Sequence, residues 1–198
     1  MNFLAAILFI APVAAGVLVG YAMGGSLAGL VSARLRLLWL LWLAAVVQAG
    51  ELGTRALSGA LGRDLRLPLL TVTFALVGAW LAANLPGRSR AMQIAVCMAL
   101  TGGLANGLAI AANGRMPYLP AAARIAQLPA GLATPKNVAA APGSHLVALG
   151  DIIPVPQLHA VLSIGDTLIV TATIVLIATA MRQTPRSLIL HQHWKDAT

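Results

Sequence analysis

Long apolar segments alternate along the chain with short polar ones. Five segments have a length and composition typical of membrane-crossing helices: Phe3–Met23, Leu37–Leu52, Leu67–Leu85, Ala91–Ala112 and Val161–Met181. Leu, Val, Ile and Ala follow one another within them, without the strict alternation of barrel strands. The pattern predicts an all-α, polytopic membrane helix bundle of about five transmembrane helices, folded as a single domain over residues 1–198.

A long segment without this pattern, residues 113–159, separates the last two predicted helices. It contains seven prolines, is rich in Ala and carries little charge. A linker between domains would be more polar, so we expect this loop to lie on the bilayer surface or to pack over the bundle. Long loops without regular structure are often functional.

The basic residues predict an orientation. Close pairs, Arg34 with Arg36 and Arg88 with Arg90, flank two of the connections, whereas the basic residues on the other side are spread out. Tight pairs beside helix ends count most in the positive-inside rule. We therefore expect the N-terminus and the long loop outside the membrane, and a cytoplasmic C-terminal tail over residues 182–198.

Composition supports this assignment. Hydrophobic residues make up 59% of the chain and charged residues 9%, whereas soluble domains have about 25% charged residues. The net charge of +8 is scattered between apolar segments, which indicates lipid headgroups and not nucleic acid as the partner. Other membrane-protein subunits are possible partners. We expect no cofactor, because no P-loop or dinucleotide fingerprint occurs, and Cys97, the single cysteine, is expected to be buried.

Two aspartates are the main candidates for chemistry. Asp166 lies near the start of the last predicted helix, where a carboxylate in hydrocarbon costs roughly 2.5–3.5 kcal/mol. Asp151 precedes it in "LGDIIPVP". Two carboxylates held close in a low-dielectric site share a proton, so one can take a proton from water while the other protonates a carbonyl oxygen. We expect Asp151 and Asp166 to be a catalytic dyad.

Polar residues on the fourth predicted helix are candidates for binding substrate. Asn106 and Asn113 share one helix face, and Arg115 follows and could hold a phosphate or carboxylate. The pair Gly103 and Gly107 would let another helix approach closely.

On the last predicted helix, Ser163, Thr167 and Thr171 repeat every four residues. With Asp166 beside it, this stripe predicts a face turned away from lipid. Ser163 is a further candidate for binding substrate.

Other roles for the aspartates remain open at this stage. Asp166 could form a structural ion pair with Arg115 or Arg124. Alternatively, His145 and His159 could join the two aspartates in a metal site, although their spacing matches no named metal motif.

Three stretches, "ANGLAIAANGRMP", "LGDIIPVP" and "SIGDTLIV", together resemble a family of small bacterial integral membrane proteins of unknown function. The last third of the chain also resembles the lipoprotein signal peptidases, which are membrane aspartic peptidases. Asp151 and Asp166 match the order and spacing of the two catalytic aspartates of that family, and Ser163 stands where it has an asparagine. This resemblance implies a peptidase that uses Asp151 and Asp166.

Three functions follow as hypotheses. The first is an intramembrane aspartic hydrolase that uses the Asp151/Asp166 dyad at the extracytoplasmic membrane face. The second is a non-enzymatic protein, an accessory subunit or small-ligand scaffold with structural aspartates. The third is a transporter, which the lack of an internal repeat disfavours.

Overall fold

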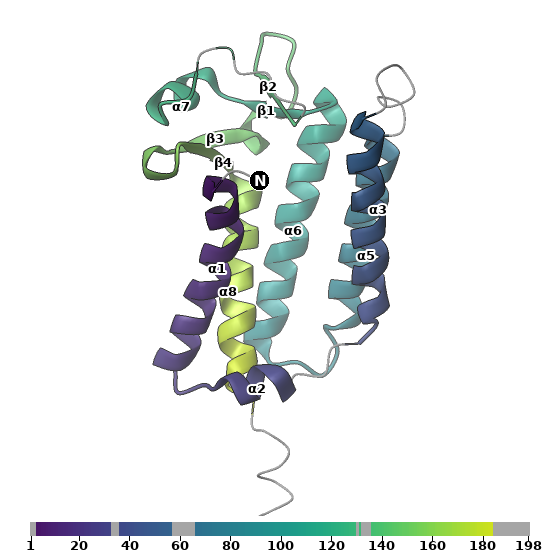
Figure 1. Cartoon of the computed structure of the whole chain (residues 1–198), viewed down its shortest axis with the longest axis vertical. Helices are drawn as coiled ribbons and strands as arrows, with labels where there is room; N and C mark the ends of the chain where they lie inside the picture. The colour runs from purple at the N-terminus through teal and green to yellow at the C-terminus, as the bar shows by residue number, and fades with distance from the viewer. Residues whose placement is uncertain (1–2, 33–35, 57–65, 130, 132–135, 184–198) are drawn as a thin grey trace, which may run out of the picture.

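The computed structural model describes residues 3–32, 36–56, 66–129, 131 and 136–183, without the side chains of 3–9, 51–56, 66–68 and 70. The long helices are α1 (Phe3–Ala22), α3 (Leu38–Ala56), α5 (Arg66–Ala83), α6 (Arg90–Asn113) and α8 (Ile164–Met181). They stand side by side, with a small sheet across one end and the short helix α2 (Leu27–Ser32) at the other (Figure 1). Most of the predicted tail lies outside the described residues.

The pair α6 and α8 forms the centre of the bundle. The buried residues of α6 recur at helical spacing along one face: Met92, Ala95, Val96, Gly102, Asn106 and Ala109. A Cβ added to Gly102 would lie 2.5 Å from the carbonyl oxygen of Gly165, and one added to Gly165 would lie 2.6 Å from that of Gly102. The two backbones therefore touch through a pair of glycines, and no other residue fits at either position.

Two expectations about α6 are wrong. The close approach uses Gly102 and not Gly103 or Gly107, because a Cβ on Gly103 would lie 3.8 Å from Phe74 and one on Gly107 would meet nothing within 4 Å. Gly103 and Gly107 instead line an apolar cavity of about 540 Å³ between α5 and α6. Cys97 is exposed and not buried, because it lies on a face of α6 that no described element covers.

The segment between α6 and α8 is not an irregular loop, so the all-α expectation is wrong there. It contains β1 (Met116–Tyr118), β2 (Asn137–Ala139), β3 (Asp151–Val155) and β4 (Ala160–Ser163), with helix α7 (Pro120–Ile125) and the 3₁₀ turns η1 (Val147–Leu149) and η2 (Pro156–Leu158). The strand order is β2-β1-β3-β4. Strand β1 is parallel to β2 and β3, and β4 is antiparallel to β3.

Proline chemistry explains why this segment is extended. A proline lacks the backbone N–H and disfavours helix at the residue before it, so Pro117 and Pro154 oppose helix formation in β1 and β3. The last helix also begins later than predicted, at Ile164 and not Val161. Residues 161–163 pair with β3 instead, and the Ser163 side chain caps the helix.

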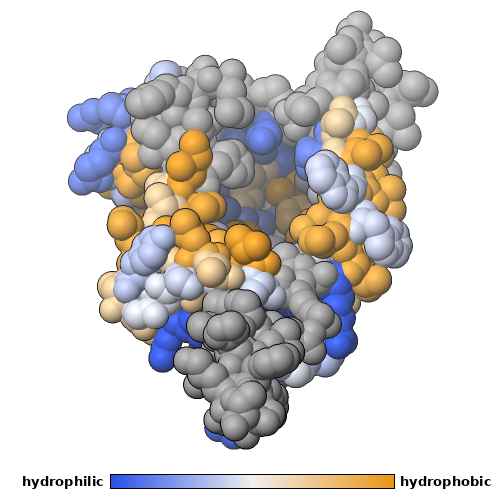
Figure 2. Space-filling model, turned by 60° about the horizontal axis from the view of Figure 1, so that its bottom comes forward, coloured by the Kyte–Doolittle hydropathy of each residue, from blue (hydrophilic) through white to orange (hydrophobic). Residues whose placement is uncertain are grey.

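Two of the helices, α6 and α8, are long and apolar enough to cross a membrane among the residues described. Only 28% of the apolar window of each is buried. Shorter apolar stretches occur in α1, α3 and α5, at Ile10–Ala22, Leu38–Gly50 and Thr71–Ala83. Figure 2 shows hydrophobic residues over the flanks of the helices. The number of crossings stays a prediction.

Candidate functional site

The site begins at the junction between β4 and α8. Ser163 is fully buried and caps the helix: its Oγ accepts a hydrogen bond from the backbone N–H of Asp166 at 2.9 Å. In return, Asp166 Oδ2 accepts one from the backbone N–H of Ser163 at 3.0 Å. This reciprocal capping box satisfies two N–H groups that the first turn of a helix otherwise leaves unpaired. It fixes the Asp166 carboxylate at the end of the bundle that the sheet covers.

Asn106 of α6 locks this junction to the neighbouring helix. Its Nδ2 donates to Asp166 Oδ1 at 2.8 Å, and its Oδ1 accepts from the Ser163 hydroxyl at 2.8 Å. Asn106 reaches both because Gly165 has no side chain; a Cβ there would overlap Asn106 Oδ1. Both oxygens of Asp166 therefore act as acceptors from fixed donors on two elements. The alternative ion pair of Asp166 with Arg115 or Arg124 stays a prediction.

Asp151 occupies the matching position on β3. It is directly opposite Ser163 in the β3–β4 ladder and next to Tyr118 in the β1–β3 ladder. Its side chain is only 6% exposed. Its Oδ2 accepts a hydrogen bond from Asn137 Nδ2 at 2.5 Å. The sheet thus brings Asp151 beside the residue that caps Asp166.

The two carboxyl groups interact electrostatically. Burial and the nearby charge of Asp166, in that order, raise the pKa of Asp151 from 3.8 to about 7, against an opposite effect of the Asn137 amide. A low-dielectric surrounding disfavours the charged carboxylate, and a like charge nearby adds to this. Asp151 can therefore hold or release a proton near neutral pH, which a general acid requires.

A small cavity opens onto Asp151. Its volume is about 190 Å³, and its lining includes Tyr118, Leu128, Asn137 and Val161 besides Asp151. The lining comes from all four strands and from the segment around α7. It can take one compact apolar group next to an ionisable one.

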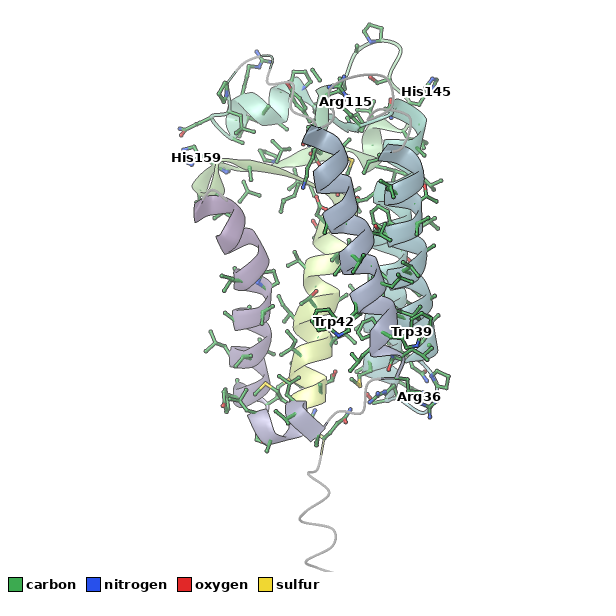
Figure 3. The ribbon with its side chains drawn as sticks, turned by 45° about the vertical axis from the view of Figure 1, so that its right-hand side comes forward. Arg36, Trp39, Trp42, Arg115, His145 and His159 are labelled. Carbon is green, nitrogen blue, oxygen red and sulfur yellow. The ribbon has the colours of Figure 1, made fainter. Side chains whose placement is uncertain are left out.

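Asn113, expected to bind substrate, bonds instead to the segment before β3. Asn113 Nδ2 donates to the carbonyl oxygen of His145 at 2.7 Å, and its Oδ1 accepts from the N–H of His145 at 2.9 Å. It therefore fastens the segment before β3 to the end of α6. Arg115 lies at the sheet end of the molecule (Figure 3); its substrate role stays a prediction.

The polar stripe on α8 is only partly as expected. Thr167 and Thr171 are exposed and bond back to carbonyl oxygens of their own helix at 3.1 and 2.8 Å. Only the Ser163 end of the stripe faces protein. His145 and His159 lie at opposite sides of the sheet layer (Figure 3), and among the described residues no three His, Cys, Asp or Glu side chains come together. The four-ligand metal site is therefore wrong.

Sequence reasoning missed Asn137. It precedes Asp151 by 14 residues and reaches it only because β2 and β3 lie on either side of β1. No local motif marks such a contact.

A protein-family model matches residues 32–178. The chain belongs to the family of unknown function DUF5317. The span matched to DUF5317 includes Asn106, Asn137, Asp151, Ser163 and Asp166, which together make up the site. No curated protein and no solved structure matches the chain, so the function has to be argued from the site itself.

Proposed function

We propose that this DUF5317 protein is an aspartic hydrolase of the membrane surface that cleaves peptide bonds with Asp151 and Asp166. One observation carries the proposal: two carboxylates from separate elements interact at the sheet–bundle boundary, and the pKa of Asp151 is about 7. The resemblance to lipoprotein signal peptidases in the order and spacing of the two aspartates supports the same reading. Ser163 and Asn106 are positioning residues for Asp166.

The reaction needs one acid and one base. Asp166, as carboxylate, takes a proton from a water molecule, and the water oxygen forms a bond to the carbonyl carbon of the substrate. Asp151 gives its proton to the carbonyl oxygen, which yields a neutral tetrahedral diol. When the carbon–nitrogen bond breaks, the amine takes the proton from Asp166 and a hydroxyl proton returns to Asp151. Both carboxyl groups then regain their starting states.

We propose that the chain crosses a bacterial plasma membrane several times, with its sheet outside. Exposed apolar side chains on the helices favour lipid contact, among them Leu18 at 69%, Val46 at 67% and Leu104 at 64% exposure. Trp39 and Trp42 lie exposed near the lower end of α3, just above Arg36 (Figure 3). Tryptophan is enriched at the membrane–water interface of membrane proteins, and arginine is enriched just beyond the ends of their helices.

Carboxyl titration tests the dyad without a known substrate. The chain has four aspartates, Asp64, Asp151, Asp166 and Asp196, so aspartate labelled with ¹³C at Cγ gives four signals that single Asn variants assign. We expect Asp151 to titrate near 7 and its pKa to fall in Asp166→Asn, because the like charge is removed. An unchanged Asp151 titration in that variant would mean that the carboxylates act independently.

Activity is tested on peptides that carry a transmembrane segment, presented in lipid nanodiscs, with fragments detected by mass spectrometry. Asp151→Asn and Asp166→Asn are each expected to lower the cleavage rate by about 10²–10⁴-fold. His145→Gln serves as the control, since His145 bonds to Asn113 through its backbone alone. Full activity in either aspartate variant would exclude the dyad.

A second candidate has an observation in its favour. Both Asp166 oxygens are engaged by Asn106 and by the capping box, which suits a structural aspartate in a non-enzymatic subunit. That function predicts that Asp166→Asn unfolds the protein or frees it from a complex, while Asp151→Asn changes nothing in cells. A folded but inactive Asp166→Asn protein would decide for the hydrolase.

A further inference from the structure

A second polar region lies at the end of the bundle away from the sheet. A cavity of about 540 Å³ lies between the start of α6 and the end of α8, and its lining includes Arg88, Ser89, Thr179, Arg182 and Gln183. The two guanidinium groups come from segments far apart in the sequence. No acidic side chain is among the residues that line it. The cavity is therefore suited to an anion.

This outer cavity adjoins an apolar one. The inner cavity has a volume of about 210 Å³ and shares Arg88 and Met92 with the outer one. Its lining is mainly aliphatic and includes Leu30, Leu176 and Ile177, together with Trp80. Arg88 and Met92 thus lie between the polar outer cavity and the apolar inner one. Such a pair of cavities matches an amphiphile with a charged head and a hydrocarbon chain.

An unpaired donor lies in the wall of the inner cavity. Trp80 Nε1 is buried and has no hydrogen-bond partner, the one such side-chain atom among the residues described. The adjacent amide of Asn84 is fully used: it donates to the carbonyl oxygens of Arg36 and Trp80 and accepts from the N–H of Arg36. Buried indole N–H groups normally find an acceptor. The N–H is closed off from the cavity, so an oxygen of a ligand reaches it only when the indole turns.

We propose that these joined cavities bind an anionic phospholipid. Its phosphate lies between Arg88 and Arg182, and an acyl chain enters the aliphatic chamber. The Trp80 indole turns as the chain enters and donates its N–H to an oxygen of the ester region. Guanidinium groups pair well with phosphate oxygens. Inorganic phosphate shares the head chemistry, but it would leave both the chamber and the indole donor unused. The site is independent of the hydrolase proposed above.

Fluorescence quenching tests this site directly. The chain has four tryptophans, so Trp39→Phe, Trp42→Phe and Trp194→Phe together leave Trp80 as the reporter. The protein is placed in phosphatidylcholine nanodiscs with increasing fractions of phosphatidylglycerol whose chains are brominated. Trp80 quenching is expected to saturate at a low fraction of phosphatidylglycerol. A matched protein that keeps only Trp42, which is 75% exposed, is expected to follow the bulk fraction.

Charge variants give the control. Arg182→Gln is expected to weaken the Trp80 response by about fivefold, because one surface guanidinium attracts an anionic lipid by about 1 kcal/mol. Arg124→Gln changes the net charge equally but lies in α7, so it should leave the response unchanged. Equal effects of the two variants, or Trp80 quenching that follows the bulk fraction, would overturn the site.

A second measurement uses the unaltered sequence. Native mass spectrometry should retain one phosphatidylglycerol in preference to phosphatidylcholine, and Arg182→Gln should lose that preference. Inorganic phosphate added to phosphatidylcholine nanodiscs tests whether the site binds free phosphate instead of the phosphate of a lipid. If phosphate raises the thermal midpoint and phosphatidylglycerol neither quenches Trp80 nor stays bound, the site takes free phosphate and the lipid proposal fails.

Discussion

The two ends of this bundle differ in whether a buried polar group is left without a hydrogen-bond partner. At the sheet end, Asn106, Ser163 and Asp166 satisfy one another through four hydrogen bonds. At the other end, Trp80 Nε1 is buried and unpaired. A low dielectric strengthens paired polar groups and penalises unpaired ones. The first end is thus complete within the chain, whereas the second is complete only with something added.

The largest expected effect concerns Asp151 at the sheet end, because burial disfavours the charged form of its carboxyl group. The folded pKa of Asp151 is raised from 3.8 to about 7, so between these pH values the folded protein holds a proton that the unfolded chain has lost. The contribution of Asp151 to the free energy of unfolding is therefore greatest below about pH 4 and falls as pH rises to about 7, by up to about 4 kcal/mol. Asp151→Asn should remove this slope and be more stable than the unaltered protein at pH 8. Denaturation in detergent across pH measures it; parallel curves would contradict the raised pKa.

The next largest effect concerns the packing of α8 against α6 at Gly165. Gly165→Ala places a methyl group against Asn106 and the Gly102 carbonyl, and we expect a loss of about 1–3 kcal/mol, typical of overpacking. Gly107→Ala is the control, because its Cβ would meet nothing within 4 Å. It should be neutral or slightly stabilising. Thermal midpoints of the two variants compare them, and equal losses would mean that the glycine contact does not hold α6 to α8.

A smaller change tests how the sheet tunes Asp151. The Asn137 amide lowers the pKa of Asp151 against the effect of burial. Asn137→Ala should therefore raise that pKa above about 7, by about one unit, since hydrogen bonds to charged groups contribute about 1.5–3 kcal/mol at most. The labelled carboxyl signal reports the shift. Asn113→Ala, which removes an amide bonded to backbone atoms, should leave the signal in place.

The smallest expected effect is at the incomplete end. Trp80→Phe removes the unpaired N–H and keeps most of the ring. In detergent without anionic lipid it should stabilise the protein by up to about 1 kcal/mol, the lower range for an unsatisfied buried donor. Adding phosphatidylglycerol should cancel this advantage, since only the tryptophan can donate to the lipid. A variant that is destabilising in both conditions would show that the indole N–H already has a partner.

The sequence predicts the long elements of this fold well. Apolar composition over stretches such as 91–112 and the polar break before 164 determine where α6 and α8 lie, because helix formation in an apolar surrounding depends mainly on local composition. The order and spacing of Asp151 and Asp166 also mark them as candidates. These features are local, so single-sequence reasoning reaches them.

The sheet and the full site are not predictable in this way. Strands of three to five residues, such as β2 and β3, carry too little periodicity to distinguish them from a proline-rich loop. Asn137 meets Asp151 only through a pairing of separate strands. The choice of Gly102 over Gly103 depends on which face of α6 meets α8, and the sequence offers small residues on both faces.

The direct passage from β4 into α8 links the site to bilayer thickness. Eighteen helical residues extend about 27 Å, close to the roughly 30 Å of a hydrocarbon core. Ser163 is the last residue of β4 and the N-cap of α8, so no linker residue separates the strand from the helix. In the membrane topology proposed above, a thicker or thinner bilayer changes the tilt of α8, and Ser163 turns with the helix relative to Asp151. Lipid chain length then becomes a physical control on the distance between two carboxyl groups.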